Sequence, residues 1–293
     1  MALNFKTLTI RTMTAAVFVA VLLTCINYNY ISFACLFLVV SIWGLYEFYQ
    51  LSEKLGAKPY KPIGYLAGGC LFSYSVVANS NMALFFPTEN IFAYILIFVF
   101  FVFVIALFDD SKNTVLNITH TFAGLIYAVV PFAVLVNITC IDKSFTLNHQ
   151  TGNLFNDIAP YNPHYVLGII LLIWANDVCA YLVGSLIGKH KLYERISPGK
   201  TWEGSIGSAI LTMGCSFIIA NWYPELSLKH WMIITVIICV FGTIGDLVES
   251  MLKRQAGVKD SGRIMPGHGG ILDRFDSLLF VAPFIYAYLI LVR

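Results

Sequence analysis

The amino-acid sequence predicts an all-α integral membrane protein with about nine transmembrane helices. Hydrophobic residues make up 58% of the 293 residues and charged residues only 12%, which is about half of the roughly 25% that is typical of soluble domains. The hydrophobic residues are also gathered in long runs, as membrane spans require. Because the bilayer core offers the backbone no hydrogen-bond partners, helices are the expected form of these runs.

Nine hydrophobic segments are the candidate spans. They are Thr12–Ile26, Tyr30–Tyr49, Ile63–Ala78, Asn90–Phe108, Ile118–Ile138, His164–Leu186, Glu203–Ala220, His230–Gly245 and Ser277–Val292. Several are shorter than the ~20 residues that cross a bilayer, and the first and third are the weakest candidates. The first follows Lys6 and Arg11 as a signal peptide would. It has no obvious cleavage site, so we expect a retained span.

The placement of basic residues predicts the orientation of these spans. With the N-terminus inside, all but three of the 18 lysines and arginines fall on the inner side, and only Lys143, Lys229 and Arg293 lie outside. Lysine and arginine concentrate in the cytoplasmic loops of membrane proteins. We therefore expect the N-terminus inside and the C-terminus outside in a cell membrane, with the bacterial inner membrane as the expected location.

The longest outer segment, residues 139–163, predicts a division into two groups of helices. We expect an N-terminal transmembrane helix group over residues 1–160 and a C-terminal catalytic transmembrane region over residues 161–293. Inner loops of the first group are short and carry few candidate functional residues, whereas those of the second group are rich in Gly, Lys, Arg, Asp and His. Function is therefore expected in the second region, at its cytoplasmic loops.

Composition argues against two classes of function. The formal net charge is only +2, so no nucleic-acid partner is expected. None of the seven cysteines stands in a CxxC pair, so neither a zinc site nor a disulfide framework is expected.

The segment Gly245–Ser277 carries the densest set of charged residues. Asp246 and Glu249 are three residues apart and share a helical face at the inner end of the eighth span. Asp273 and Asp276 have the same spacing at the start of the ninth span, and a basic, glycine-rich loop joins the two pairs. Carboxylates of this kind suit a hard cation such as magnesium (Mg²⁺), which keeps positions for water and substrate phosphate.

Simpler explanations exist for single members of this segment. An aspartate at a helix start, such as Asp276, is often only a cap, and basic residues at an inner boundary often set topology alone. His268 lies between glycines, where it is suited equally to phosphate binding or acid–base chemistry and to a hydrogen bond with the loop backbone. Convergence of four carboxylates with four basic residues favours a functional site.

A second basic segment runs from Gly188 to Gly204. Gly199-Lys200-Thr201 resembles the end of a P-loop, but that motif needs glycine at position 194, which holds Glu194. Ser197 and Pro198 are typical of a helix cap followed by proline in the first helical turn. Anionic lipid headgroups are an alternative ligand for this basic loop.

Asp177 lies inside the sixth span, nine residues before Leu186, which is about 14 Å along a helix. An intramembrane carboxylate is costly and indicates function, although pairing with a neighbouring helix is the alternative. Glu47, near the inner end of the second span, is a weaker candidate, since a position at the membrane interface would also explain it.

In these motifs the chain resembles the phosphatidate cytidylyltransferase (CDP-diacylglycerol synthase) family. The resemblance is carried by S-M-L-K-R-Q-A-G-V-K-D-S-G-R-I-M-P-G-H-G-G-I-L-D-R-F-D from Ser250 to Asp276 and by the upstream segments N-D-V-C-A-Y, G-K-H-K-L and I-S-P-G-K-T-W-E-G. It implies transfer of the cytidylyl group of CTP to phosphatidic acid, giving CDP-diacylglycerol and pyrophosphate with a divalent cation. CTP, phosphatidic acid and membrane lipids are thus the implied partners, and a homodimer stays open.

The resemblance also implies roles for individual residues. Asp246 and Asp273 would be the principal metal ligands with Asp276 in support, and Asp177 would complete a polar cavity or bind a second cation. Lys253 and Arg254 would hold lipid phosphate, whereas Lys200, Lys259 and the 266–270 loop would meet the CTP phosphates. The implied catalytic residues are Asp246, Asp273, Asp276, Lys253 and Lys259, and the implied substrate-binding residues are Lys200, Ser197, Arg254, His268, Gly269, Gly270 and Arg274.

Two rival functions fit the sequence less well. A CDP-alcohol phosphotransferase would need the DGxxAR…GxxxDxxxD motif, but Leu247 follows Asp246 and the second aspartate pair has DxxD spacing. A transporter or channel would more often show internal repeats and broken midplane helices, and the sequence indicates neither.

Overall fold

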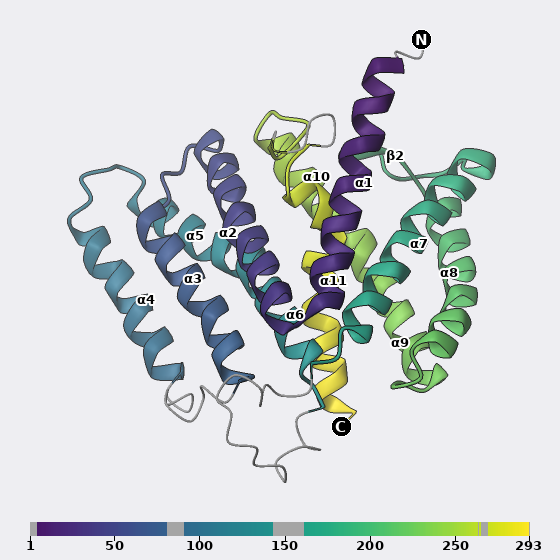
Figure 1. Ribbon diagram of the computed structural model, residues 1–293. Coiled ribbons are helices and arrows are strands. Elements are labelled where there is room, and N and C mark those ends of the chain that lie inside the picture. Colours follow the sequence, from purple (N-terminus) through teal and green to yellow (C-terminus); the bar gives the residue numbers. More distant parts are fainter. Residues whose placement is uncertain (1–4, 81–90, 143–160, 263, 265–268, 293) are drawn as a thin grey trace, which may run out of the picture. The chain divides into compact units, whose positions relative to one another are not determined.

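The computed structural model describes residues 5–80, 91–142, 161–262, 264 and 269–292, and almost all of them are helical (Figure 1). Candidate substrate-binding residue His268 lies outside these described residues. In chain order the elements are α1 (Phe5–Tyr28), α2 (Tyr30–Lys54), α3 (Lys61–Ala78), α4 (Ile91–Leu107), α5 (Thr114–Gly124), the π-helix η3 (Leu125–Val129), α6 (Val130–Thr139), α7 (His164–Ile187), β1 (Lys191–Tyr193), β2 (Ser197–Thr201), α8 (Trp202–Trp222), α9 (Leu228–Ile237), the π-helix η5 (Ile238–Gly242), α10 (Thr243–Gln255) and α11 (Leu272–Leu291).

Among the described residues, six helical runs are long and apolar enough to cross a membrane. They are Tyr30–Lys54, Thr114–Thr139, His164–Ile187, Trp202–Trp222, Leu228–Gln255 and Leu272–Leu291. Thr12–Tyr28 and Ala93–Leu107 are shorter apolar helices. The expected fold class, an all-α polytopic membrane protein, is confirmed. The count of nine spans and the sides on which the termini lie stay predictions.

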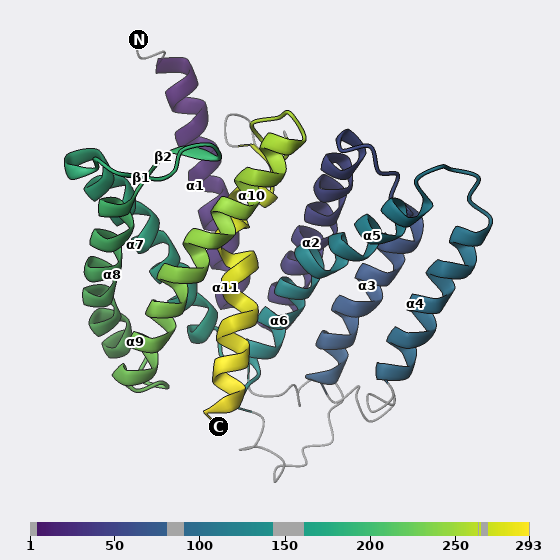
Figure 2. The same ribbon diagram turned by 180° about the vertical axis from the view of Figure 1, so that it is seen from behind.

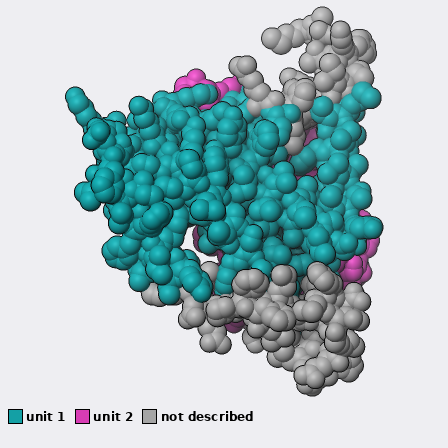
Figure 3. Space-filling model, turned by 60° about the vertical axis from the view of Figure 1, so that its left-hand side comes forward, with its two compact units in different colours: residues 1–162, 260–274 teal, residues 163–259, 275–293 magenta. Residues whose placement is uncertain are grey.

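The chain forms two compact units, which Figure 3 colours separately. The first comprises residues 1–162 and 260–274, and the second comprises residues 163–259 and 275–293. The loop before α11 and the first residues of that helix therefore belong to the first unit, and the rest of α11 belongs to the second.

In the first unit, α2 packs against α3 and α5 around a buried tyrosine (Figure 1). The Tyr49 hydroxyl donates a hydrogen bond to the Thr121 carbonyl at 3.0 Å. Gly64 and Gly124 both lie where a Cβ would overlap the Tyr49 side chain. Small residues of this kind let membrane helices approach closely, and here they bring α3 and α5 against the buried ring on α2.

In the second unit, α7 and α8 lie side by side (Figure 2). A Cβ on Gly204 would lie 3.0 Å from the Ala180 carbonyl oxygen, and one on Gly207 would overlap Val183. The two helices therefore depend on glycine for their close approach, as membrane helix pairs commonly do.

The basic segment between α7 and α8 folds as a hairpin. Strands β1 and β2 pair in antiparallel fashion, with Lys191 opposite Thr201 and Tyr193 opposite Ser197. The expectation that Ser197 and Pro198 begin a helix is wrong, because both lie in β2. Thr201 is the N-cap of α8 instead, and its side chain accepts a hydrogen bond from the Gly204 amide at 3.1 Å. The hairpin thus ends directly at the cap.

In the part of the chain that the structure describes, two spans contain a π-helical turn. In η3 the Val130 amide bonds to the Leu125 carbonyl, and Pro131 follows without an N–H to continue the α-helical ladder. In the second unit, η5 ends at Gly242, whose carbonyl accepts a hydrogen bond from the Ser277 hydroxyl at 3.2 Å. This side-chain donor satisfies a backbone acceptor at the helical irregularity that directly precedes α10.

Candidate functional site

Three aspartates and one lysine from four elements form a charged cluster in the second unit. Asp246 lies on α10, and its Oδ2 is 2.6 Å from Nζ of Lys200 at the end of β2. Asp177 on α7 interacts electrostatically with Asp246 and Lys200. Asp276 on α11 interacts with Asp246, Asp177 and Lys200. Motifs that are separate in the sequence thus meet in one place.

The charge of this cluster favours a cation. Asp246 pairs with the Lys200 ammonium group, and the Asp177 and Asp276 carboxylates lie within electrostatic range of the same lysine and of Asp246. A divalent ion would offset the repulsion among these carboxylates. Carboxylate oxygens are the ligands that magnesium prefers, and Asp246 and Asp276 provide them. Among the described residues, no group of three or more His, Cys, Asp or Glu side chains is arranged to hold a metal ion. The carboxylates of Asp246 and Asp276 have the donor chemistry that a hard divalent cation takes.

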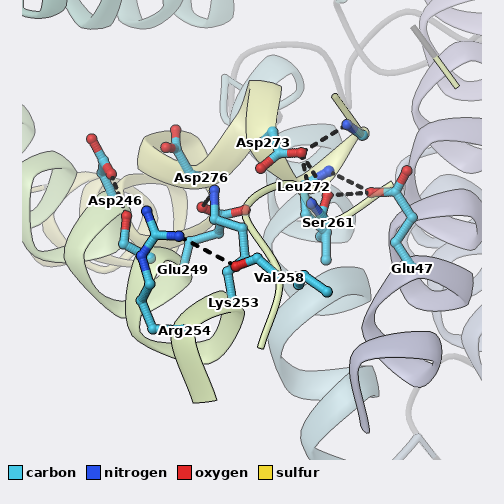
Figure 4. Close-up of polar contacts among 12 residues, drawn as sticks. Glu47, Asp246, Glu249, Lys253, Arg254, Val258, Ser261, Leu272, Asp273 and Asp276 are labelled. Carbon is cyan, nitrogen blue, oxygen red and sulfur yellow. Dashed lines mark hydrogen bonds and ion pairs between the residues drawn. The ribbon is translucent and has the colours of Figure 1, made fainter. Parts of the chain in front are cut away.

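On α10 a buried ion pair lies one turn from Asp246. Glu249 is only 1% exposed, and its carboxylate pairs with Lys253 at i+4 (Figure 4). Arg254 next to it is exposed, and its Nη1 donates to the Val258 carbonyl at 3.4 Å. Lys253 is therefore engaged with Glu249, whereas the Arg254 guanidinium is the more accessible cation.

The hairpin is held by a carboxylate rather than by its own basic residues. Glu203, in the first turn of α8, accepts hydrogen bonds from the amides of Lys189 and His190 at 3.1 Å, and it pairs with the His190 ring. Ser197 is half-buried in β2. Lys191 and Arg195 are exposed, so the hairpin presents cations to its surroundings.

A second network, in the first unit, surrounds Asp273. Asp273 Oδ2 accepts hydrogen bonds from the Gly270 amide at 2.7 Å and from the Ser261 amide at 2.8 Å (Figure 4). Gly269 has φ +80°, and a Cβ there would also overlap the Asp273 carboxylate. Gly269, which was predicted to meet substrate phosphate, is thus required by the close approach of the loop to Asp273.

Glu47 of α2, the weaker candidate in the sequence, belongs to the same network, and its link to the loop before α11 was not predicted. Its carboxylate is buried at 2% exposure and accepts hydrogen bonds from the Ser261 hydroxyl and from the amides of Ile271 and Leu272. A signal was present in the sequence, because a carboxylate within a span demands partners. The Gly-Gly-Ile sequence before α11 also offers no side-chain cap of its own.

The predicted residues therefore fall into separate groups. Asp177, Asp246, Asp276 and Lys200 lie together in the second unit, whereas Asp273 is bound into the loop of the first. Lys259 and Arg274 are exposed. A joint site of Asp246 and Asp273 stays a prediction, because they belong to different units.

The class that these features define is a polytopic helical membrane protein with clustered carboxylates and a basic hairpin. A model of the cytidylyltransferase family matches residues 9–292, and the chain belongs to this family. The family expected from the sequence motifs is thereby confirmed.

Individual relatives are similar over a shorter range. The phosphatidate cytidylyltransferase of Staphylococcus haemolyticus (strain JCSC1435) is 51% identical over 132 residues, which are 43% of this chain and 49% of that protein. The proteins of the same name from Staphylococcus saprophyticus and Staphylococcus aureus (strain COL) are 50% and 49% identical, again over 43% of this chain and 49% of theirs. The chain thus spans about half the length of the curated relatives it matches.

Proposed function

We propose that this protein transfers the cytidylyl group of CTP to phosphatidic acid in phospholipid biosynthesis. The observation that carries the proposal is the cluster of Asp177, Asp246 and Asp276 around Lys200, next to a basic hairpin. Support also comes from family membership and from the relatives that are named phosphatidate cytidylyltransferase.

The reaction is a phosphoryl transfer between two anionic substrates. An oxygen of the phosphatidic acid phosphate attacks the α-phosphorus of CTP and forms a new P–O bond. The bond from that phosphorus to the bridging oxygen breaks, and pyrophosphate leaves with its electron pair, giving CDP-diacylglycerol. Proteins accelerate such reactions mainly by positioning and charge neutralisation. Lys200 and the exposed Lys259 are the residues that we assign to the phosphates of CTP.

Asp246 and Asp276 would hold a magnesium ion, and Asp177 would add to this site or bind a second cation. When bound, the ion supplies a positive charge that offsets the charge on the phosphates. Lys200 remains beside Asp246 and keeps that carboxylate directed towards the cluster. Asp273 is kept among the metal ligands on the strength of the family resemblance.

Arg254 is the residue that we assign to the lipid phosphate. Its exposed guanidinium lies in the last turn of α10, a helix that continues from the span beginning at Leu228. A guanidinium can bind two phosphate oxygens at once. With the predicted orientation, this helix end faces the cytoplasm of a bacterial inner membrane, where CTP arrives from water and phosphatidic acid from the bilayer.

The decisive experiment is incorporation of labelled CTP into chloroform-extractable lipid by the purified protein. Vesicles with phosphatidic acid and Mg²⁺ should give labelled CDP-diacylglycerol and an equal amount of pyrophosphate, and vesicles of phosphatidylcholine alone are the control. A CDP-alcohol phosphotransferase would instead consume CDP-diacylglycerol and release CMP. A transporter would move label across sealed vesicles without producing a labelled lipid. Either result would overturn the proposal.

A further inference from the structure

Glu47 of α2 has a carboxylate whose hydrogen-bond donors, among the described residues, come from the segment that leads into α11. Its Oε2 accepts a hydrogen bond from the Ser261 hydroxyl at 2.8 Å and one from the Leu272 amide at 3.0 Å. Its Oε1 accepts the Ile271 amide at 3.0 Å. More than 200 residues separate donor and acceptor in each case, so this contact joins distant parts of the chain within the first unit (Figure 4).

The contact with Glu47 acts as a helix cap supplied from another helix. The first amides of a helix have no partner within the helix, and a residue before it usually provides one through a side-chain oxygen. Gly269, Gly270 and Ile271 precede α11 and have no such oxygen. A carboxylate at this end is also favoured by the helix dipole. Glu47 therefore supplies acceptors that the residues before α11 lack, and its charge adds to that of Asp273 in the first turn of the helix.

Ser261 links this cap to Asp273. The Ser261 Oγ lies 2.8 Å from Glu47 Oε2 and 3.0 Å from Asp273 Oδ2, and its one hydroxyl hydrogen can serve only one of them at a time. The Ser261 and Gly270 amides hold the same Asp273 oxygen. Two carboxylates are thus held in one network of donors, and a displacement of Glu47 would change the position of Asp273.

The glycines of the loop are adapted to this arrangement. A Cβ on Gly262 or on Gly270 would overlap the Glu47 carboxylate. Such close approach of backbone to a charged group is a requirement that only glycine meets. The loop is therefore shaped around Glu47 as well as around Asp273.

We infer that Glu47 is a positioning residue that sets the start of α11 and, through Ser261, the direction of the Asp273 carboxylate. The inference rests on the proposed function only in taking Asp273 as part of the catalytic machinery. Glu47 itself contacts the loop rather than a substrate, so its effect on the reaction passes through the residues it holds.

Glu47→Gln is the variant that tests the inference. Glutamine has one acceptor oxygen, so one of the amides of Ile271 and Leu272 would face an NH₂ group instead of an oxygen. Hydrogen–deuterium exchange should become faster in peptides covering residues 269–275, and kcat should fall roughly 10- to 100-fold, as small displacements in active sites commonly cause. The matched control is Glu53→Gln on the same helix, where the carboxylate pairs with Lys61 near the surface, and it should change neither measurement.

A merely structural role is distinguished by combining variants. If Glu47 acts through Asp273, Glu47→Gln should cause little further loss of kcat in an Asp273→Asn background, whereas independent destabilisation would multiply the two losses. Unchanged exchange or multiplied losses would overturn the inference. Should Glu47→Gln fail to fold, Ser261→Ala removes only the linking hydroxyl, and unchanged exchange and kcat in that variant would likewise overturn it. The exchange measurement needs no substrate, so absence of cytidylyl transfer in the wild-type protein would refute the proposed function separately.

Discussion

Asp246→Asn tests the proposed site most directly, because it removes one negative charge from the cluster while keeping the size of the side chain. The substitution affects two interactions. It weakens the contact with Lys200, which is 2.6 Å from Oδ2, and it removes a charged oxygen from the proposed magnesium site. The Ser250 hydroxyl, which donates to Oδ1 at 3.3 Å, can keep its acceptor, because asparagine retains one oxygen.

The expected losses of stability and of activity differ greatly. The Lys200 and Asp246 side chains are 25% and 32% exposed, and a pair as accessible as this contributes about 0–1 kcal/mol to folding. We therefore expect the melting temperature to fall by only a few degrees. Loss of a metal ligand removes transition-state stabilisation of several kcal/mol, roughly 3–5 kcal/mol. Since 1.36 kcal/mol is a factor of ten, turnover should fall by roughly 10²- to 10⁴-fold.

The assay is incorporation of labelled CTP into lipid over a series of Mg²⁺ concentrations, with thermal unfolding followed in the same detergent. Asp110→Asn is the matched control, because Asp110 is exposed and has no part in the proposed machinery. The double variant with Asp273→Asn should be little worse than either single variant if the two aspartates act as a unit. Near-normal turnover of Asp246→Asn at limiting Mg²⁺ would refute the metal assignment.

Four further predictions concern topology, lipid binding, stability and pH. Reporter fusions after Lys191 and after Arg293 should lie inside and outside, respectively, and the reverse result at either site would contradict the orientation. Arg254→Ala should raise the KM for phosphatidic acid by roughly 10- to 150-fold, with a smaller change for CTP. Lys253→Ala should instead lower the melting temperature, since it breaks a buried ion pair. Equal KM changes for both substrates of the Arg254 variant would exclude a lipid-phosphate role. Hydrogen bonds from Tyr60 and Ser111 lower the pKa of Asp109 from 3.8 to about 2, so its contribution to stability is present above pH about 4 and is lost as the pH falls towards 2. Thermal unfolding of Asp109→Asn should show less pH dependence between 4 and 2 than the wild type, and an equal dependence would refute this assignment.

The helical segments could be predicted from the sequence because the bilayer imposes a simple rule. A run that must satisfy its own backbone in lipid has to be helical, and hydrophobicity alone reveals such runs. Helix caps and turns depend on which side chains lie nearby, so they could not be predicted from hydrophobicity. Ser197 and Pro198 matched a helix start, yet the hairpin occupies those positions and Thr201 caps α8 instead.

The residues of the charged cluster were predictable one by one, but their grouping was not. Asp177 was expected to be functional because a carboxylate within a span is costly, and its interaction with Asp246 and Lys200 agrees with a polar cluster. Lys253 was expected to hold phosphate, which stays a prediction, and the structure pairs it with the buried Glu249. Their i, i+4 spacing places Glu249 and Lys253 on one face of α10. Only the burial of Glu249 in the tertiary structure determines that Lys253 pairs with it.

By itself the sequence determined the fold class, the polarity of the loops and the chemistry of the motifs, because these follow from hydrophobicity, charge and residue type along a single stretch of chain. Only the tertiary structure decided which groups meet. Glu47 and Leu272 are 225 positions apart, and no periodicity or local motif relates them. Their contact depends on α2 packing beside the start of α11, where a buried carboxylate is tolerated because amide and hydroxyl donors replace its water.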